Sequence, residues 1–314
     1  MPFLVQRREY TFPSAGSARM WSWPRAVYPP VVAGARPSVS AVSVTLGIDL
    51  SATDAKTAAC AIRWENGRGS VDVPRRGLSN DDLRVLITDA AAAGVDAPFS
   101  WPVPFPRTLV EHGSTGGWPA DYRSPRYQLR ATDLFVDGIA RRPLSVSTDR
   151  IGVTAMRCAR LLQEFAEDRG KRRLDLTGRD GIYEVYPAAA LSAWGAKAAG
   201  FDAEGYKSGS EAKVRRAKLV DTFAAATADW LHFPGAAQQE CVTRDDALDS
   251  FIAALATRAA HLGRTRAPET VEQQQLAPVE GWIHVPEHGS LSMLVANRAT
   301  SRSAECGRGR LGPA

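Results

Sequence analysis

The hydrophobic pattern of the chain changes repeatedly between the two-residue period of strands and the longer period of helices. Over 41–50 (AVSVTLGIDL) apolar residues alternate with small or polar ones, which predicts a strand that ends near Asp49. Similar patterns at 57–64 and 69–74 predict two further strands, and the turns between them favour an antiparallel meander. The first predicted unit is therefore a three-stranded β-sheet.

Helical patterns follow this meander. Residues 79–94 are amphipathic, with Ser79 or Asn80 as the N-cap and Gly94 closing the helix, and 94–102 forms a short strand broken by prolines. The remaining predicted elements are a strand over 181–187 and helices over about 131–139, 152–169, 188–197, 211–228 and 244–262. This order predicts an α/β fold in which helices flank a mixed sheet.

Composition divides the chain into a central domain and two tails. Residues 1–40 are rich in Pro, Ser, Ala and Arg, and 288–314 are rich in Gly, Arg and Ser, so both are predicted to be disordered. The domain between them, 41–287, contains a long insertion after its fourth strand, over 101–150. No apolar run approaches the roughly 20 residues that cross a bilayer, and the N-terminus does not resemble a secretory signal. No membrane partner is expected.

Charge and cysteine spacing narrow the functional classes. The net charge is +5, but residues 1–40 hold five arginines and one glutamate, and 288–314 hold four arginines and one glutamate. The central domain keeps 30 basic and 32 acidic residues, so the basic tails are weak support for a nucleic-acid groove. The four cysteines are far apart and lack C-x-x-C spacing, which disfavours disulfides or zinc and fits a reducing cytoplasm.

Four acidic residues conflict with their local context. Asp49 ends an apolar strand and shares a face with Gly47, which is expected to leave open space beside it. Asp96 ends the proline-broken strand, Glu184 lies within an apolar strand, and Asp249 lies on a helix face of small apolar residues. Carboxylates directed toward a core are destabilising unless they are paired, hydrogen-bonded or bound to a metal.

These residues, with Asp246 one turn before Asp249, predict a divalent metal site. Hard oxygen ligands favour Mg²⁺ or Mn²⁺ over zinc. Two such ions about 4 Å apart activate a water and stabilise the leaving oxygen in phosphodiester cleavage, without a histidine or cysteine nucleophile. The interpretation is a metal-dependent nuclease that acts on DNA or RNA, with Asp49, Asp96, Glu184 and Asp249 as its catalytic carboxylates.

Each acidic residue also has an ordinary structural interpretation. The aspartates at strand ends can stabilise turns, and Glu184 can pair with Arg130. Asp246 can interact favourably with the helix macrodipole, whereas Asp249 lies too far into its helix to cap it. The combination of acidic residues is more specific than any one of them.

Five short blocks of the sequence together resemble a known prokaryotic family. In chain order they are GIDLSAT, GVDAPFSWP, YQLRATDLFV, YEVYPAAAL and DDALDSFIAAL, and the resemblance spans about 44–286. The family is domain-of-unknown-function family 429, which is generally described as predicted nucleases with a ribonuclease H-like fold. The resemblance implies that fold for the central domain.

The resemblance also implies roles for individual residues. Asp49 corresponds to the first-strand aspartate of ribonuclease H-like enzymes, and Asp96 falls in an acidic-Ala-Pro block. Asp246 and Asp249 fall where similar folds, including Holliday-junction resolvases, place the last metal ligand on a C-terminal helix. Many relatives have alanine after that aspartate, and this chain has Ser250, a small departure.

Two basic residues are candidates for substrate binding. Arg130 matches the family's Arg-x-x-Asp block together with Asp133, and Glu184 matches its Glu-Val-Tyr-Pro block. A cation such as Arg130 or Lys207 near the carboxylates can hold a phosphate or stabilise the transition state. The same residues can instead balance Asp133 or Glu184 in a structural ion pair, which is the favoured interpretation.

Two other functions compete with the nuclease. GIDLSAT also resembles the phosphate-binding hairpin of actin-like ATPases and sugar kinases, in which Ser51 and Thr53 would contact phosphate. Those proteins carry two copies of the fold, and this chain shows no second Asp-x-Gly hairpin. The other alternative is a ribonuclease H-like scaffold that binds nucleic acid or a protein without cleavage, because the central domain is not basic.

Overall fold

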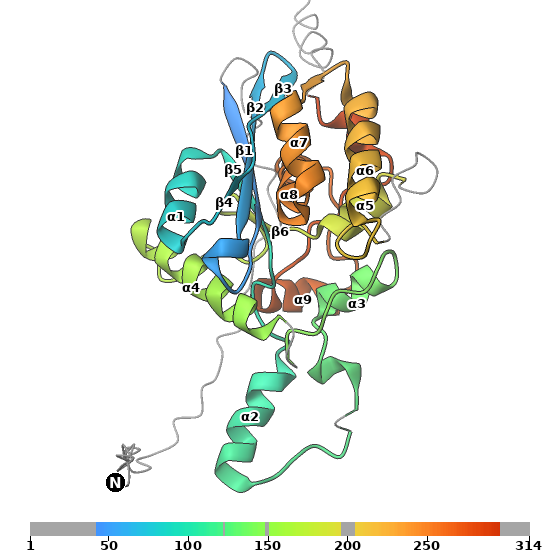
Figure 1. The fold of residues 1–314 in the computed structure, drawn as a ribbon. Helices are drawn as coiled ribbons and strands as arrows, with labels where there is room; N and C mark the ends of the chain where they lie inside the picture. Colours follow the sequence, from blue (N-terminus) through green and yellow to red (C-terminus); the bar gives the residue numbers. More distant parts are fainter. Residues whose placement is uncertain (1–41, 122, 148–150, 196–204, 296–314) are drawn as a thin grey trace, which may run out of the picture. The chain divides into compact units, whose positions relative to one another are not determined.

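Seven strands of the described residues form one mixed sheet (Figure 1). The computed structural model describes residues 42–121, 123–147, 151–195 and 205–295, so the disorder predicted for 1–40 lies outside the described residues. The strands are β1 Ser43–Asp49, β2 Ala58–Glu65, β3 Arg68–Val71, β4 Arg75–Arg76, β5 Ala92–Asp96, β6 Ile182–Glu184 and β7 Leu231–His232. Their order is β6-β5-β1-β2-β3-β7, and β4 pairs with β2.

Strand directions follow from the lengths of the connections. The short turns make β1, β2 and β3 an antiparallel meander, as the sequence predicts. The helical connections make β5 parallel to β1 and β6 parallel to β5. Because parallel neighbours end at the same edge of a sheet, the last residues of β1 and β5, Asp49 and Asp96, are paired in register.

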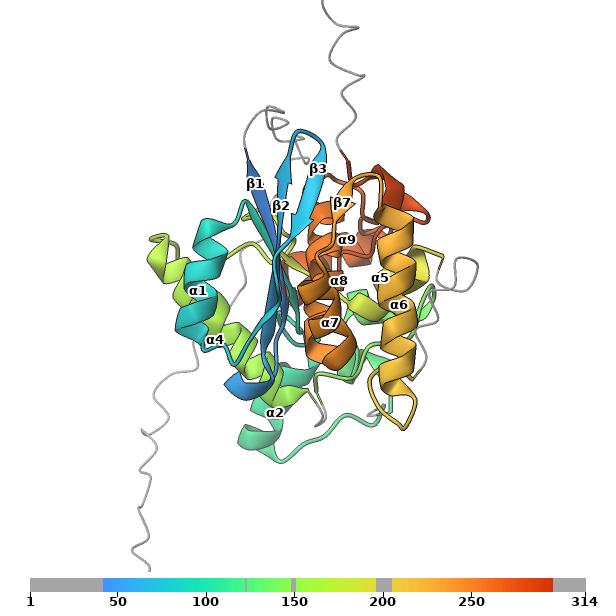
Figure 2. The same ribbon diagram turned by 45° about the horizontal axis from the view of Figure 1, so that its top comes forward.

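Helices flank both faces of this sheet (Figures 1 and 2). The helices of the described residues are α1 Asn80–Asp89, α2 Pro104–Thr115, α3 Ala131–Asp137, α4 Gly152–Asp168, α5 Pro187–Ala193, α6 Ala212–Thr227, α7 Gly235–Thr243, α8 Asp245–His261 and α9 Val271–Glu280. On one face Ile48 and Val95 pack in a core with Leu161 of α4, and α1 contributes to the same core. On the other face α8 packs on the sheet, with α6 and α7 against it. The predicted mixed α/β arrangement is confirmed.

Two glycines allow α8 to lie directly on the sheet. Gly47 and Gly94 are paired in register on β1 and β5. A Cβ atom at Gly47 would lie 2.1 Å from the backbone nitrogen of Ala254, and one at Gly94 would lie 2.0 Å from Oγ1 of Thr257. The expectation that Gly47 leaves open space beside Asp49 is wrong, because the backbone of α8 fills that space. The close approach brings the first turns of α8 to the edge where β1 and β5 end.

The boundary between α1 and β5 also differs from the sequence prediction. A capping box between Ser79 and Asp82 starts α1, but the helix ends at Asp89. Ala92 and Ala93 belong to β5, so Gly94 lies within a strand and closes no helix. Alanine favours helix in isolation. Here Ala93 is paired between β1 and β6 and buried in the core shared with α1 and α4, and these tertiary contacts override the propensity.

Several elements were not predicted because their local patterns are weak. Strands β4 and β7 have two residues each, too few to show a period, and α9 contains Pro278. Residues 288–295, assigned by composition to the C-terminal tail, belong to the fold, since Ser290–Met293 forms a 3-10 helix and Leu294 is buried. Among the described residues no helix has the length and apolar character of a membrane span.

Candidate metal centre

The end of the paired strands β1 and β5 places two carboxylates side by side. Asp49 and Asp96 are direct neighbours in the parallel register, and both side chains are half-buried. Among the hydrogen bonds between described residues, none is accepted by either carboxylate, although both lie beside a closely packed core. Two adjacent acidic groups without donors require another source of positive charge.

The third carboxylate comes from α8. Asp249 lies in the second turn of this helix, and its residue is 1% exposed. One ligand oxygen from each of Asp49, Asp96 and Asp249 lies within 4.8 Å of the others. Residues separated by up to 200 positions therefore form one cluster. The reason is that Gly47 and Gly94 let α8 pack directly on the strands that carry the other two aspartates.

The electrostatics of this aspartate cluster favour neutralisation. Burial raises the pKa of Asp49 well above its ordinary value, and the charges of Asp249 and Asp96 raise it further. Burial raises the pKa of Asp96 to about 7, against the lowering effect of Lys207. Burial also raises the pKa of Asp249, although Lys207 and a hydrogen bond from Tyr206 oppose the rise. Without a cation the aspartate cluster therefore binds protons more readily than isolated aspartates do.

Two consecutive residues contact Asp249 directly. The Tyr206 hydroxyl donates to Oδ1 over 2.6 Å, and Nζ of Lys207 lies 2.5 Å from Oδ2. Tyr206 is buried, whereas the side chain of Lys207 is 53% exposed. Burial lowers the pKa of Lys207, but the charges of the aspartates more than offset this effect and raise it above its usual value. The predicted cation Lys207 thus lies at the cluster.

Glu184 lies in a different charged group. The Arg130 guanidinium, itself 1% exposed, donates to both Glu184 oxygens over 2.7 and 2.8 Å and to both Asp133 oxygens over 2.9 and 3.0 Å. Glu184 also accepts from the backbone nitrogen of Phe99, three residues after Asp96. Burial raises the pKa of Glu184 and Arg130 lowers it in part. The structure does not bring Glu184 or Arg130 into the aspartate cluster, and both complete a buried ion-pair network instead.

Asp246 is also engaged elsewhere. Arg76 donates to it through Nε and Nη2 over distances of 2.5 to 2.9 Å, and the backbone nitrogen of Ala247 donates over 2.8 Å. Its negative charge still contributes to the raised pKa of Asp49. Asp246 therefore neighbours the aspartate cluster while its carboxylate is already paired, and its role as a metal ligand stays a prediction.

Sequence reasoning missed Tyr206 and Arg76. Tyr206 lies in GYKSGS, a polar stretch without periodicity, and Arg76 lies in a two-residue strand. Neither carries a local signal of contact with an acidic residue more than 40 positions away. Long-range hydrogen bonds of this kind follow from the packing of α8 and are invisible in the linear pattern.

The residues present fit a divalent cation. Three carboxylates from β1, β5 and α8 supply hard oxygen donors, and two of them have no donor among the described residues. Lys207 already inserts an ammonium group at the edge of the cluster, so the site accepts positive charge. Three carboxylates beside one ammonium leave an excess of negative charge, which a divalent cation such as Mg²⁺ or Mn²⁺ can neutralise.

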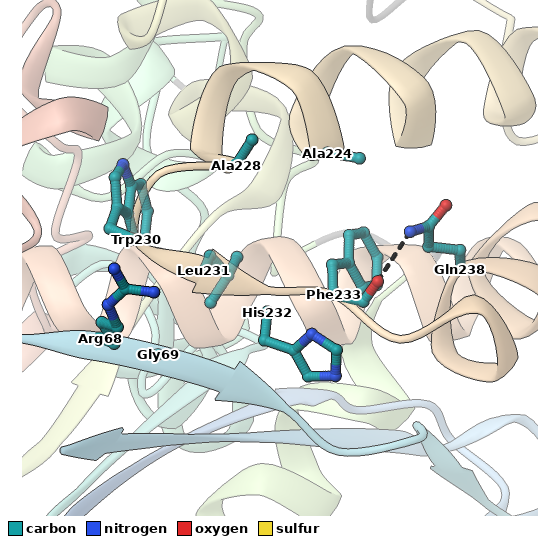
Figure 3. Close-up of a pocket in the computed structure, with 9 residues that line it drawn as sticks. All are labelled: Arg68, Gly69, Ala224, Ala228, Trp230, Leu231, His232, Phe233 and Gln238. Carbon is teal, nitrogen blue, oxygen red and sulfur yellow. Dashed lines mark hydrogen bonds between the residues drawn. The ribbon is translucent and has the colours of Figure 1, made fainter.

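A separate cavity of about 340 Å³ lies near the other end of the sheet, beside β3, β7 and α6 (Figure 3). Its lining includes Arg68, Trp230 and His232, and the Gln238 side chain donates to the carbonyl of Phe233. No aspartate or glutamate lines it. The cavity and the aspartate cluster are therefore distinct sites.

A family model described as a protein of unknown function (DUF429) matches residues 47–273. The chain belongs to this family. The DUF429 match begins inside β1 and includes all three clustered aspartates. No curated protein and no solved structure gives a significant match to the chain.

Proposed function

We propose that this DUF429 protein is a metal-dependent nuclease with a ribonuclease H-like fold, which hydrolyses phosphodiester bonds in DNA or RNA. The order β3-β2-β1-β5-β6, in which only β2 runs against the others, supports this fold, as does α8 packed across β1. In this proposal the stretch after β5 that contains α2 is the expected insertion. The fold places the ends of β1 and β5 at one edge, where such enzymes hold their acidic residues.

One observation carries the proposal. Oxygens of Asp49, Asp96 and Asp249 lie within 4.8 Å of one another, close enough for shared ions whose ligand bonds are about 2.1 Å long. Mg²⁺ or Mn²⁺, when bound, would activate a water and stabilise the leaving oxygen. Asp49 and Asp96 are half-buried, so the site is partly accessible to solvent.

The chain's own residues have distinct tasks in this proposal. Asp49 and Asp96 would hold the metal from the sheet, and Asp249 would hold it from the helix. Tyr206 fixes the rotamer of Asp249 by donating to Oδ1. Arg130, buried and engaged by two carboxylates, orients the segment after Asp96 through Glu184 and Phe99, and it does not reach the substrate.

A cleavage assay tests the proposal. Purified full-length protein is incubated with labelled single-stranded, duplex and branched nucleic acids in Mg²⁺, in Mn²⁺ or in EDTA. We expect metal-dependent cleavage that Asp49→Asn and Asp249→Asn reduce by about 100-fold or more, because a metal ion contributes several kcal/mol to such reactions. The matched control is Asp229→Asn, an exposed aspartate outside the cluster, which should cleave like the wild type.

The same assay separates the two alternatives. Binding of nucleic acid by the wild type without cleavage in any metal would support a non-catalytic scaffold and contradict the nuclease. Tight nucleotide binding with phosphoryl transfer would instead support the kinase-like interpretation of Ser51 and Thr53.

A further inference from the structure

Lys207 makes a contact that a metal ion would have to change. Its ammonium lies 2.5 Å from Oδ2 of Asp249, and the Tyr206 hydroxyl occupies Oδ1 at 2.6 Å. Both oxygens of Asp249 are therefore engaged by donors, whereas no hydrogen bond between described residues is accepted by the carboxylate of Asp49 or Asp96. A carboxylate oxygen can accept a hydrogen bond and ligate a metal at once, but a cation bound to Oδ2 at about 2.1 Å would lie within about 4.6 Å of the Lys207 nitrogen and would repel it.

The two partners of Asp249 differ in how firmly they are held. Tyr206 is 2% exposed, and its carbonyl accepts a 2.6 Å hydrogen bond from Nη1 of Arg216. Arg216 also donates to the carbonyls of Val242 and Thr243 near the end of α7, so the backbone at Tyr206 is fixed. The Lys207 side chain is 53% exposed and has four rotatable carbon–carbon bonds beyond the backbone. Lys207 is thus the partner that can leave.

The charge of the cluster gives a reason for this exchange. Without metal, one ammonium partly compensates three closely spaced carboxylates. With a divalent ion in place, the ammonium is repelled by the metal and no longer required by Asp249. A released lysine at the rim of the site is a point charge suited to a phosphate oxygen.

We propose that Lys207 is an internal counter-ion that a divalent metal displaces from Asp249, and that its released ammonium then binds a phosphate of the nucleic acid. The inference rests on the proposed nuclease function. It assigns one residue two successive partners, and it predicts effects of opposite sign on metal binding and on substrate binding when the charge is removed.

The test uses the full chain with Lys207→Met, which keeps an unbranched apolar side chain and removes the charge. Mn²⁺ affinity is measured from the free-ion electron paramagnetic resonance signal, and we expect it to rise about tenfold, a modest effect because the lysine is half exposed. Affinity for a fluorescent single-stranded oligonucleotide is measured by anisotropy in Ca²⁺. We expect weaker binding with a log–log salt slope reduced by about 0.7, the loss of one phosphate contact.

The matched control is Lys213→Met, an exposed lysine in α6 outside the site, which should leave both affinities unchanged. Equal Mn²⁺ affinity in Lys207→Met and the wild type overturns the inference, and so does unchanged oligonucleotide binding. Weaker binding of both ligands also overturns it, because a merely structural lysine would act in that way. Wild-type protein that binds no Mn²⁺ identifies failure of the metal centre itself, and the inference falls with it.

Discussion

Two clusters of charged side chains, the ion-pair network around Arg130 and the aspartate cluster beside Lys207, each combine one basic residue with several acidic ones. They differ in how the basic side chain contacts the carboxylates. In the ion-pair network, the Arg130 guanidinium meets both oxygens of Asp133 and of Glu184 in a buried fork. In the aspartate cluster, an exposed ammonium meets one oxygen of Asp249. The first arrangement satisfies its carboxylates and is structural, whereas the second leaves carboxylates available for a ligand.

Glu280, which lies against the ion-pair network, shows what the network connects. Glu280, 2% exposed, accepts from the backbone nitrogens of Val103 and Ala131, at the two ends of the stretch that contains α2. Its backbone carbonyl accepts from Arg130. The network therefore ties both ends of this stretch to β6, next to the strand that carries Asp96.

Removing the guanidinium should have the largest effect on stability. Arg130→Met leaves Asp133 and Glu184 buried without a partner, and we expect a loss of about 3–5 kcal/mol in the free energy of unfolding. Urea denaturation in EDTA measures it. The control is Arg142→Met, which breaks an exposed pair with Asp137 and should change stability by about 1 kcal/mol or less. Equal effects of the two substitutions would contradict a structural role for the network.

Metal binding should raise the free energy of unfolding, by less than the loss expected for Arg130→Met. At 100 times its dissociation constant, Mn²⁺ should raise the free energy of unfolding by about 2.7 kcal/mol. Asp49→Asn should abolish this increment. Glu184→Gln should lower the stability of the metal-free protein but keep the increment, because Glu184 lies outside the cluster. Loss of the increment in Glu184→Gln would show that Glu184 is a ligand after all.

The metal-free protein should lose stability as pH rises. An acid whose pKa is higher in the folded state binds its proton more tightly there, so its contribution to stability declines between about pH 4 and the folded value of about 7 for Asp96. Comparing denaturation of the wild type and Asp96→Asn in EDTA at pH 5.0 and 7.5 should reveal a decline that is about 2 kcal/mol larger in the wild type. Metal affinity should rise over the same interval, because ligands bind deprotonated. A parallel decline in both proteins would refute the assignment to Asp96.

The smallest expected effect concerns Tyr206. Tyr206→Phe removes the hydroxyl that donates to Asp249 and should lower stability by about 1–2 kcal/mol, the range for a hydrogen bond to a charged or buried acceptor. In the cleavage assay it should reduce turnover less than Asp249→Asn. A turnover as low as that of Asp249→Asn would give the hydroxyl a direct part in the reaction.

The sequence predicted an element most accurately where a regular spacing of hydrophobic residues was followed by a clear capping or turn residue. The meander of β1 to β3 and the helices α4 and α8 lie close to their predicted positions. The sequence predicted a strand after α1 but began it at Gly94, two residues late, because the preceding alanines favour a helix and only their burial makes them part of β5. It also misjudged Gly47, because the approach of α8 is a contact between segments 200 residues apart.

For the site, the sequence by itself determined which acidic residues conflict with their surroundings, because a carboxylate in an apolar pattern is visible in one dimension. It named Asp49, Asp96 and Asp249 together with Glu184 and Asp246, and it offered pairing with Arg130 only as an alternative role for Glu184. Only the tertiary structure showed that the first three lie together, that Glu184 forms an ion pair with Arg130, and that Asp246 forms one with Arg76. The physical reason is that the distribution of counter-charges among carboxylates depends on which segments pack against each other, and that packing is set by the close contact of α8 with two paired glycines.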